Sequence, residues 1–120
     1  MQINDEKYDQ KIISALKALP TPLKSFDGHD VLFDVDKRNE TIFEHIAKKT
    51  HHIYIVDVKM IPIILSNKLN LKNDRKGKRY RTYIGRRGKQ NERLKYLKIV
   101  TEINKKGKET VVTIYPIKKY

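Results

Sequence analysis

The fold class is decided by the segment KYLKIVTEINKKGKETVVTIYPI, residues 95–117. In residues 95–103 and 109–117, apolar side chains recur at every second position, a period typical of β-strands. The short connection contains Gly107, and hairpin turns favour glycine where φ is positive. The segment therefore predicts an antiparallel hairpin. The alternation in its second strand predicts Val112 and Ile114 on one face, and Val111, Thr113 and Tyr115 on the other.

The residues before this hairpin also have β character. Residues 79–86 alternate, with Tyr80, Thr82 and Ile84 on one face and Arg79, Arg81 and Tyr83 on the other. Shorter strand candidates are residues 31–35 and 69–71, and Gly85 and Gly88 are expected to bracket a turn. These strands extend the hairpin to an antiparallel meander.

Helical patterns dominate the first half of the chain. Residues 5–19 carry apolar side chains at helical spacing, and Pro20 ends that pattern. A second helix is predicted at about 40–50, with Asn39 or Thr41 as its N-cap. A third is predicted at 55–66, kinked or restarted at Pro62. Helices followed by a meander predict an α+β fold, in which N-terminal helices pack on a four- to five-stranded antiparallel sheet.

The composition predicts a single soluble domain of 120 residues. We expect an N-terminal helix within residues 1–22 and a core within 30–118. The acidic, polar start predicts no signal peptide, and the longest apolar run is too short to span a bilayer. Without cysteine there is no disulfide and no thiolate metal site. The expected location is cytoplasmic, either in the producing cell or in a target cell into which the protein is delivered.

Charge is distributed very unevenly. The formal net charge is +13, yet residues 1–60 hold nine basic and ten acidic residues, whereas residues 61–120 hold eighteen and four. Thirteen of the basic residues lie between Lys68 and Lys98, with only two acidic residues among them. Such a one-signed stretch repels itself unless a polyanion supplies the counter-charge, which predicts nucleic acid as the partner.

The predicted strand 79–86 mixes arginine with tyrosine. Arginine binds phosphate oxygens in a bidentate fork, and tyrosine stacks on bases. The alternative is a solvated sheet face whose charge serves solubility. The candidate RNA-binding residues are Lys78, Arg81, Tyr83, Arg86 and Arg87 from this basic stretch, and Lys48 and Lys49, which flank the histidines of the predicted second helix.

Three of the four histidines cluster at His45, His51 and His52. On a continuous helix His45 and His52 would share a face, and histidine is the natural proton carrier near neutral pH. They can equally be surface histidines near a helix C-terminus. A zinc site would need a further ligand, such as Asp57 or His29, and neither spacing is a recognised zinc signature.

Several catalytic signatures are absent from the sequence. There is no phosphate-binding loop, no Gly-x-Ser-x-Gly elbow and no convincing carboxylate set for two metals. Histidine, arginine and tyrosine suffice for a metal-free ribonuclease, in which a 2′-hydroxyl attacks its own phosphorus. We therefore expect neither metal nor cofactor.

The order of several short motifs resembles the barnase, EndoU, nuclease-colicin and RelE-like superfamily of RNases, most closely its phage and polymorphic-toxin branch. The motifs are EHIAKKTH at 44–51, IPIILSN at 61–67, Arg79-Tyr80, LKIV at 97–100 and VVTIYP at 111–116. The similar region spans about residues 30–118.

The resemblance implies a small α+β RNase that cleaves RNA without a metal, as a toxin domain or a phage-encoded enzyme. By position it implies that His45 is a catalytic acid or base, Arg79 a phosphate ligand, and Thr113 and Tyr115 active-site groups. From spacing alone, Thr113 and Tyr115 are ordinary strand residues. His51 and His52 compete for the second histidine role.

Two other functions fit the same residues. A non-catalytic nucleic-acid-binding module would use the basic half and leave the histidines incidental. An interaction protein would dock an acidic partner, such as an immunity protein or antitoxin, on the same basic face. For an RNase, the expected RNA is tRNA or ribosome-bound mRNA, among other targets.

Overall fold

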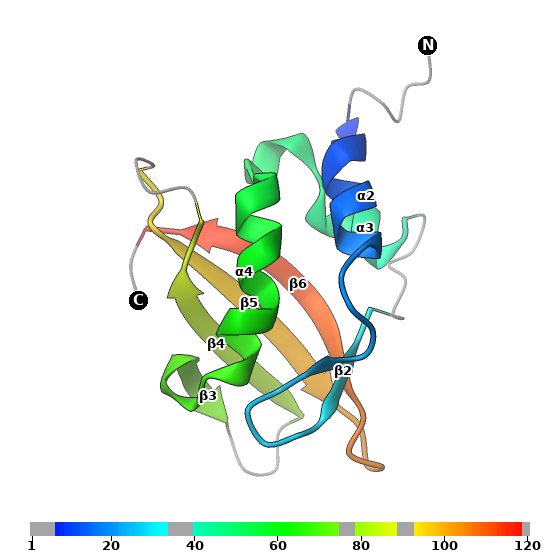
Figure 1. Ribbon diagram of the computed structural model, residues 1–120, viewed down its shortest axis with the longest axis vertical. Coiled ribbons are helices and arrows are strands. Elements are labelled where there is room, and N and C mark those ends of the chain that lie inside the picture. Colours follow the sequence, from blue (N-terminus) through cyan, green and yellow to red (C-terminus); the bar gives the residue numbers. More distant parts are fainter. Residues whose placement is uncertain (1–6, 34–39, 75–78, 89–92, 119–120) are drawn as a thin grey trace.

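A six-stranded sheet with the strand order β1-β2-β6-β5-β4-β3 forms the centre of the protein. The computed structural model describes residues 7–33, 40–74, 79–88 and 93–118. Helices α2, α3 and α4 lie on one side of the sheet (Figure 1). The strands are β1 Leu23–Lys24, β2 Asp30–Leu32, β3 Leu71–Asp74, β4 Tyr80–Arg86, β5 Tyr96–Ile103 and β6 Glu109–Ile117. The α+β class is thus confirmed.

The sheet is mixed, so the expectation of a purely antiparallel sheet is wrong. Strand β2 runs parallel to β6, and the two pair only through Val31 with Glu109 and Leu32 with Thr110. The remaining neighbours are antiparallel, including the predicted hairpin of β5 and β6. The strand candidate at 31–35 corresponds to the shorter β2, but its parallel pairing with β6 and the strand β1 were not predicted. A contact of two residue pairs between segments so distant in sequence leaves no local signal.

Of the three predicted helices, only the third has the predicted bounds. The first begins at Gln10 and not at residue 5, because Tyr8 lies in a β-bridge with Lys48 and Asp9 is the N-cap. Helix α2 spans Gln10–Lys17 and is capped by Asp9, whose side chain accepts a hydrogen bond from the Lys11 amide. Helix α4 spans Ile55–Ser66, as predicted, with Pro62 inside it. Helix α3 is much shorter than predicted, because it spans only Ile42–Ile46 and is followed by a 3₁₀ turn, Lys49–His51.

Helix α4 lies very close to strand β4 because two glycines leave room for it. A Cβ on Gly85 would come within 2.6 Å of the Ile64 side chain, and one on Gly88 within 2.3 Å of the Val56 carbonyl oxygen. Because β4 extends to Arg86, Gly85 lies inside the strand and does not bracket a turn, so that prediction is wrong.

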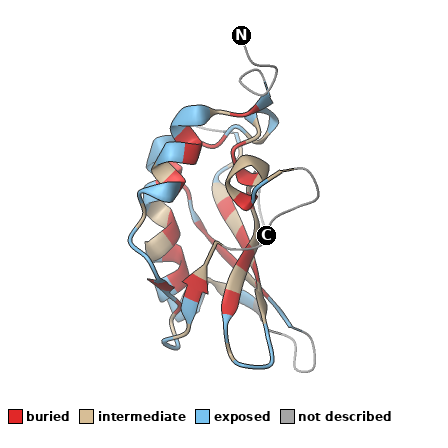
Figure 2. Ribbon diagram, turned by 90° about the vertical axis from the view of Figure 1, so that its right-hand side faces the viewer, coloured by how far each residue is buried: buried red, intermediate tan, exposed pale blue. Residues whose placement is uncertain are grey.

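The core lies between the helices and the sheet, and Figure 2 shows buried positions recurring along the strands. Strand β6 contributes both Val111 and Ile114 to it, each completely buried. Thr101 pairs with Val111 and Val100 with Thr113, so Val112 is an extra residue in a β-bulge. The bulge changes the alternation, and the predicted placement of Val111 opposite Ile114 is therefore wrong.

Candidate active site

Three side chains, from Tyr8, His45 and Lys48, meet around the carboxylate of Glu40, just before helix α3. The Tyr8 hydroxyl donates to Glu40 Oε2 at 2.6 Å, and His45 Nδ1 lies 2.9 Å from Oε1. Lys48 Nζ is 3.2 Å from the same Oε1. Burial disfavours the ionised acid, but the hydrogen bonds from Tyr8, His45 and Lys48 outweigh it and lower the pKa of Glu40 to about 2. Glu40 is therefore an anion at neutral pH.

The second imidazole of this site belongs to His51. Its Nδ1 lies 3.1 Å from the carbonyl oxygen of Ile46, and its ring centroid is 6.0 Å from that of His45. A backbone carbonyl only accepts hydrogen bonds, so Nδ1 of His51 carries a proton. The ionised Glu40 imposes the same tautomer on His45. In both rings Nε2 is then the nitrogen that exchanges protons.

Local structure explains how these groups are positioned. Thr41 caps α3 in a capping box, in which its side chain accepts from the Glu44 amide and the Glu44 carboxylate accepts from the Thr41 amide. Glu40 directly precedes that cap. The segment before α2 is attached to the same place, because the Asp9 amide donates to the Ala47 carbonyl at 2.9 Å. This brings Tyr8 to Glu40, and the hydrogen bond raises the pKa of Tyr8 to about 12.

His52 does not share a face with His45, and the expectation that it does is wrong. That expectation required one helix over 40–50, but α3 ends at Ile46. The break brings His51 toward His45 and leaves His52 exposed, with a φ of 53°. His52 lines a cavity of about 140 Å³ together with Lys48, Lys49 and Tyr54. Of the two competing histidines, His51 is the one beside His45.

Arg87 is buried, so the predicted role as an exposed RNA ligand is wrong. Its guanidinium forms a bidentate pair with the Asp57 carboxylate, in which Nε donates to Oδ1 at 3.2 Å and Nη2 donates to Oδ2 at 2.7 Å. It also donates to the carbonyl of His52 at 2.8 Å. Asp57 accepts in addition from the amides of Tyr54 and Gly88. The pair joins the start of α4 to the end of β4. Both Asp57 oxygens accept hydrogen bonds in it, so this carboxylate is not placed as a zinc ligand.

Arg81 and Tyr83 are also buried, which corrects their predicted place on an exposed anion site. Arg81 forms two hydrogen bonds to Asp27, at 3.1 and 2.6 Å, and lies 3.2 Å from Glu109. The Tyr83 hydroxyl donates to Glu109 at 2.9 Å. The alternation in β4 is as predicted, but the face with Arg81 is turned toward the core. The hydrogen bonds that Arg81 donates to Asp27 hold the pKa of the Asp27 carboxyl well below its usual range.

Within the part of the chain that the structure describes, three metal-ligating side chains gather at one place, around Arg81. Asp27, His29 and Glu109 place ligand atoms within 4.8 Å of one another. The Arg81 guanidinium already neutralises both carboxylates, which is the role that a cation would have there. The cluster lies near the turn between β1 and β2, at the opposite end of the molecule from α3 (Figure 1). His45 and His51 thus do not share a pocket with Arg81, whereas His29 lies beside it.

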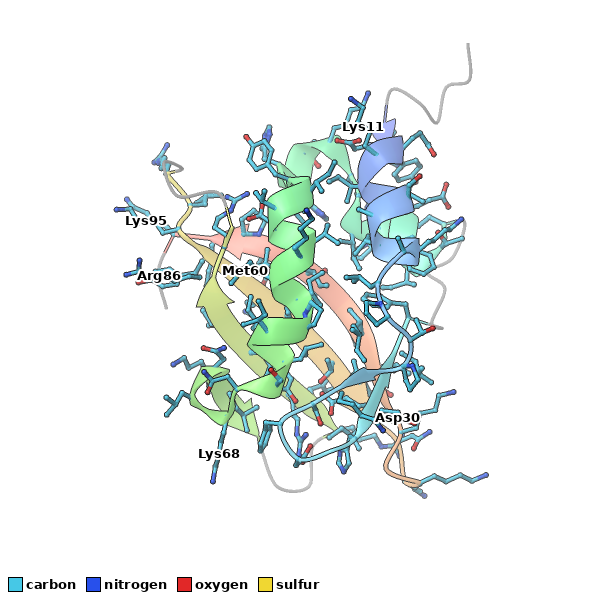
Figure 3. All side chains as sticks on the ribbon, in the orientation of Figure 1. Lys11, Asp30, Met60, Lys68, Arg86 and Lys95 are labelled. Atoms are coloured by element: carbon cyan, nitrogen blue, oxygen red, sulfur yellow. The ribbon has the colours of Figure 1, made fainter. Side chains whose placement is uncertain are left out.

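Thr113 and Tyr115 lie on the opposite face of the sheet from Arg81. Tyr115 pairs with Lys98, whose Nζ lies 5.5 Å from the centre of the tyrosine ring, and Thr113 pairs with Val100. No helix in the described parts of the chain covers this face (Figures 1 and 2). Arg79 and Arg86 are exposed, and Figure 3 shows Arg86 pointing outward. Lys78 lies outside the described residues.

Tyr8 and Glu40 are missing from the sequence-based list of site residues. Neither stands in a recognisable motif, and only the folded chain brings residues 8, 40 and 45 together. None of the described helices is long and apolar enough to cross a membrane. No family model, curated protein or solved structure matches this chain. The function must therefore be argued from the site itself.

Proposed function

We propose that this protein is a metal-independent endoribonuclease whose proton-transfer groups are His45 and His51. One observation carries the proposal: the two rings lie 6.0 Å apart, and each is held through Nδ1 by an acceptor. This leaves two Nε2 atoms for proton transfer in one small site. General acid–base catalysis needs such a pair, one group to remove a proton and one to supply it.

The reaction follows from these two groups. The 2′-hydroxyl of the RNA attacks the adjacent phosphorus, and its proton passes to Nε2 of one neutral imidazole. The bond between phosphorus and the 5′ oxygen breaks, and that oxygen takes a proton from Nε2 of the other, protonated imidazole. The products are a 2′,3′-cyclic phosphate and a 5′-hydroxyl. Lys48, beside Glu40, supplies positive charge for the pentacoordinate intermediate.

The uncovered sheet face suits the rest of the RNA. Lys98 and Tyr115 combine a cation with an aromatic ring, which is the pairing that single strands use for phosphate and base contacts. Thr113 and Arg86 add a hydroxyl and a second cation to this face. Thr113 and Tyr115 lie on the sheet face that the helices leave uncovered, whereas His45 and His51 belong to the helix side, so in this proposal the two strand residues contact RNA away from the scissile phosphate. The role of Arg79 as a phosphate ligand rests on the resemblance.

The test is RNA cleavage in EDTA. The wild-type protein should cleave RNA to 2′,3′-cyclic phosphate ends, and His45→Ala should lower the rate by about 10²–10⁴-fold. Circular dichroism should show that the variant is folded. Intact RNA at high protein concentration, or an unchanged rate in folded His45→Ala, would overturn the proposal.

A second candidate is a nucleic-acid-binding module without catalysis. The same face with Lys98 and Tyr115 favours it, because stacking and phosphate contacts need no proton transfer. Binding falls steeply with salt in both cases, so only the appearance of cleaved product separates them. A toxin or phage origin and an acidic immunity partner stay predictions.

A further inference from the structure

A groove runs beside the histidine site, between the start of α2 and the segment that leads into α4. It consists of two adjoining cavities, of about 140 and 340 Å³, which share Asp9, Ile12, Ile53 and Tyr54 in their walls. The larger volume falls in the lower part of the range of small-molecule sites. Figure 3 shows Lys11, which lines the larger cavity, at the upper end of α2.

The walls of the groove combine apolar surface with one aromatic ring. Tyr54, Ile55 and Val56 are among the large hydrophobic side chains that stay exposed, at 37%, 43% and 43%. All three line the larger cavity. Exposed apolar side chains gathered in a groove mark a binding surface more often than scattered ones do.

The Tyr54 ring is held in place by the buried pair of Arg87 and Asp57. The Arg87 guanidinium lies 5.4 Å from the centre of the Tyr54 ring, and the Tyr54 amide donates to Asp57 at 3.0 Å. Because Asp57 and Arg87 are themselves buried and paired, Tyr54 is a rigid platform. A planar group that enters the groove can stack on it, with the guanidinium on the other side of the ring.

The charges of the groove select the ligand. Lys11, Lys48 and Lys49 line it and suit phosphates. Asp9 is the acidic residue common to both cavities, and it uses Oδ1 to cap α2. A carboxylate accepts hydrogen bonds and does not donate them. It therefore repels phosphate and suits the amino edge of a nucleobase.

We propose that this groove binds one nucleobase of the RNA substrate, stacked on Tyr54 and read by Asp9. The inference rests on the proposed function and names the part of the substrate that this site recognises. Lys48 connects the two sites, because it lines the smaller cavity and also contacts Glu40. Asp9 favours a base with an exocyclic amino group, and it disfavours uracil, whose amino-equivalent position is a carbonyl that repels the carboxylate.

Binding of uncleavable DNA tests the groove separately from catalysis. Fluorescence anisotropy would compare labelled pentamers of 2′-deoxycytidine and 2′-deoxyuridine, which differ little in size and cannot undergo 2′-hydroxyl attack. The wild-type protein should bind the cytosine pentamer about fivefold more tightly or better. Tyr54→Leu keeps apolar bulk but removes the ring, and should weaken binding by about 5- to 100-fold. Tyr54→Phe should restore most of it.

Matched variants control this experiment. Asp9→Asn keeps a good N-cap, so the fold should persist while the preference for cytosine is lost. Ile63→Ala alters an exposed apolar side chain of α4 outside the groove and should leave both affinities within about twofold. Equal affinities for the two pentamers in the wild type, or unchanged binding in Tyr54→Leu, would overturn the inference.

The two proposals fail in different ways. If RNA is cleaved and His45→Ala is inactive, yet Tyr54→Leu binds DNA normally, the groove is not a base site and the nuclease assignment stands. If RNA stays intact while Tyr54→Leu and Asp9→Asn change DNA binding as expected, the groove stands and the nuclease assignment falls.

Discussion

The His45 imidazole and the Glu40 carboxylate lie 2.9 Å apart, and the same carboxylate also accepts from Tyr8 and contacts Lys48. A single anion therefore orients an imidazole, holds the Lys48 ammonium beside the two histidines and attaches the N-terminal segment to α3. Removing its charge should affect both catalysis and stability.

Glu40→Gln keeps the shape of the side chain but removes the anion. We expect the cleavage rate to fall by about 10-fold or more, because an amide can present either its oxygen or its NH₂ group to His45 Nδ1 and no longer fixes the tautomer or stabilises the imidazolium by its charge. Single-turnover cleavage assays on the folded variant would measure this. A rate equal to the wild type would show that Glu40 does not position His45.

The stability of the wild-type protein should depend on this carboxyl in acid. Its pKa falls from 4.5 to about 2 on folding, so the folded state gains stability above about pH 4.5 and loses it as the pH falls toward 2. Urea unfolding at several pH values should show a difference between wild type and Glu40→Gln that shrinks over this window. A constant difference would contradict the ionised role of Glu40.

His51→Ala and His52→Ala separate two adjacent histidines with different surroundings. The His51 ring is held beside His45, whereas none of the described residues hydrogen-bonds the His52 ring. We expect the His51 variant to lose about 10²-fold or more in cleavage rate, and the His52 variant to lose much less. The reverse order would assign the second proton transfer to His52.

Arg87 and Arg86 are neighbours with opposite environments. Arg87→Met leaves Asp57 without its guanidinium in a site where Asp57 is fully buried, and removing one partner of a buried pair costs about 3–5 kcal/mol. Arg86→Met changes an exposed side chain and should cost less than about 0.5 kcal/mol. Urea unfolding of both variants is the measurement. Equal stabilities would contradict the buried pair.

Arg81 and Arg86 should have different roles, Arg81 in the stability of the fold and Arg86 in RNA binding. Arg81→Met should destabilise the fold, because Asp27 and the buried Glu109 lose their common partner. Arg86→Ala should leave the fold intact and reduce the slope of log affinity against log salt by about one. Binding titrations at several salt concentrations would show this. An unchanged slope would exclude Arg86 from the RNA contacts.

Several features of the fold follow from sequence alone, because they depend on neighbouring residues. The alternation in residues 95–103, the glycine at 107 with a φ of +82° and the third helix at 55–66 are local patterns. The Thr41 cap is local too, since its partner Glu44 is three residues away. The cluster of positive charge in the second half of the chain is a matter of composition. Such signals do not depend on what the rest of the chain does.

Which face is buried, and which distant residues meet, was decided by the tertiary structure. The period in β4 was correct, but only the helices above it determine that Arg81 points into the core and that Thr113 points away. The extra residue Val112 changed the alternation in β6. Because α3 ends at Ile46, His51 and not His52 lies beside His45. The contact of Tyr8 with Glu40 closes a long loop of the chain. Contacts of this kind arise from packing between elements, for which a linear pattern carries no information.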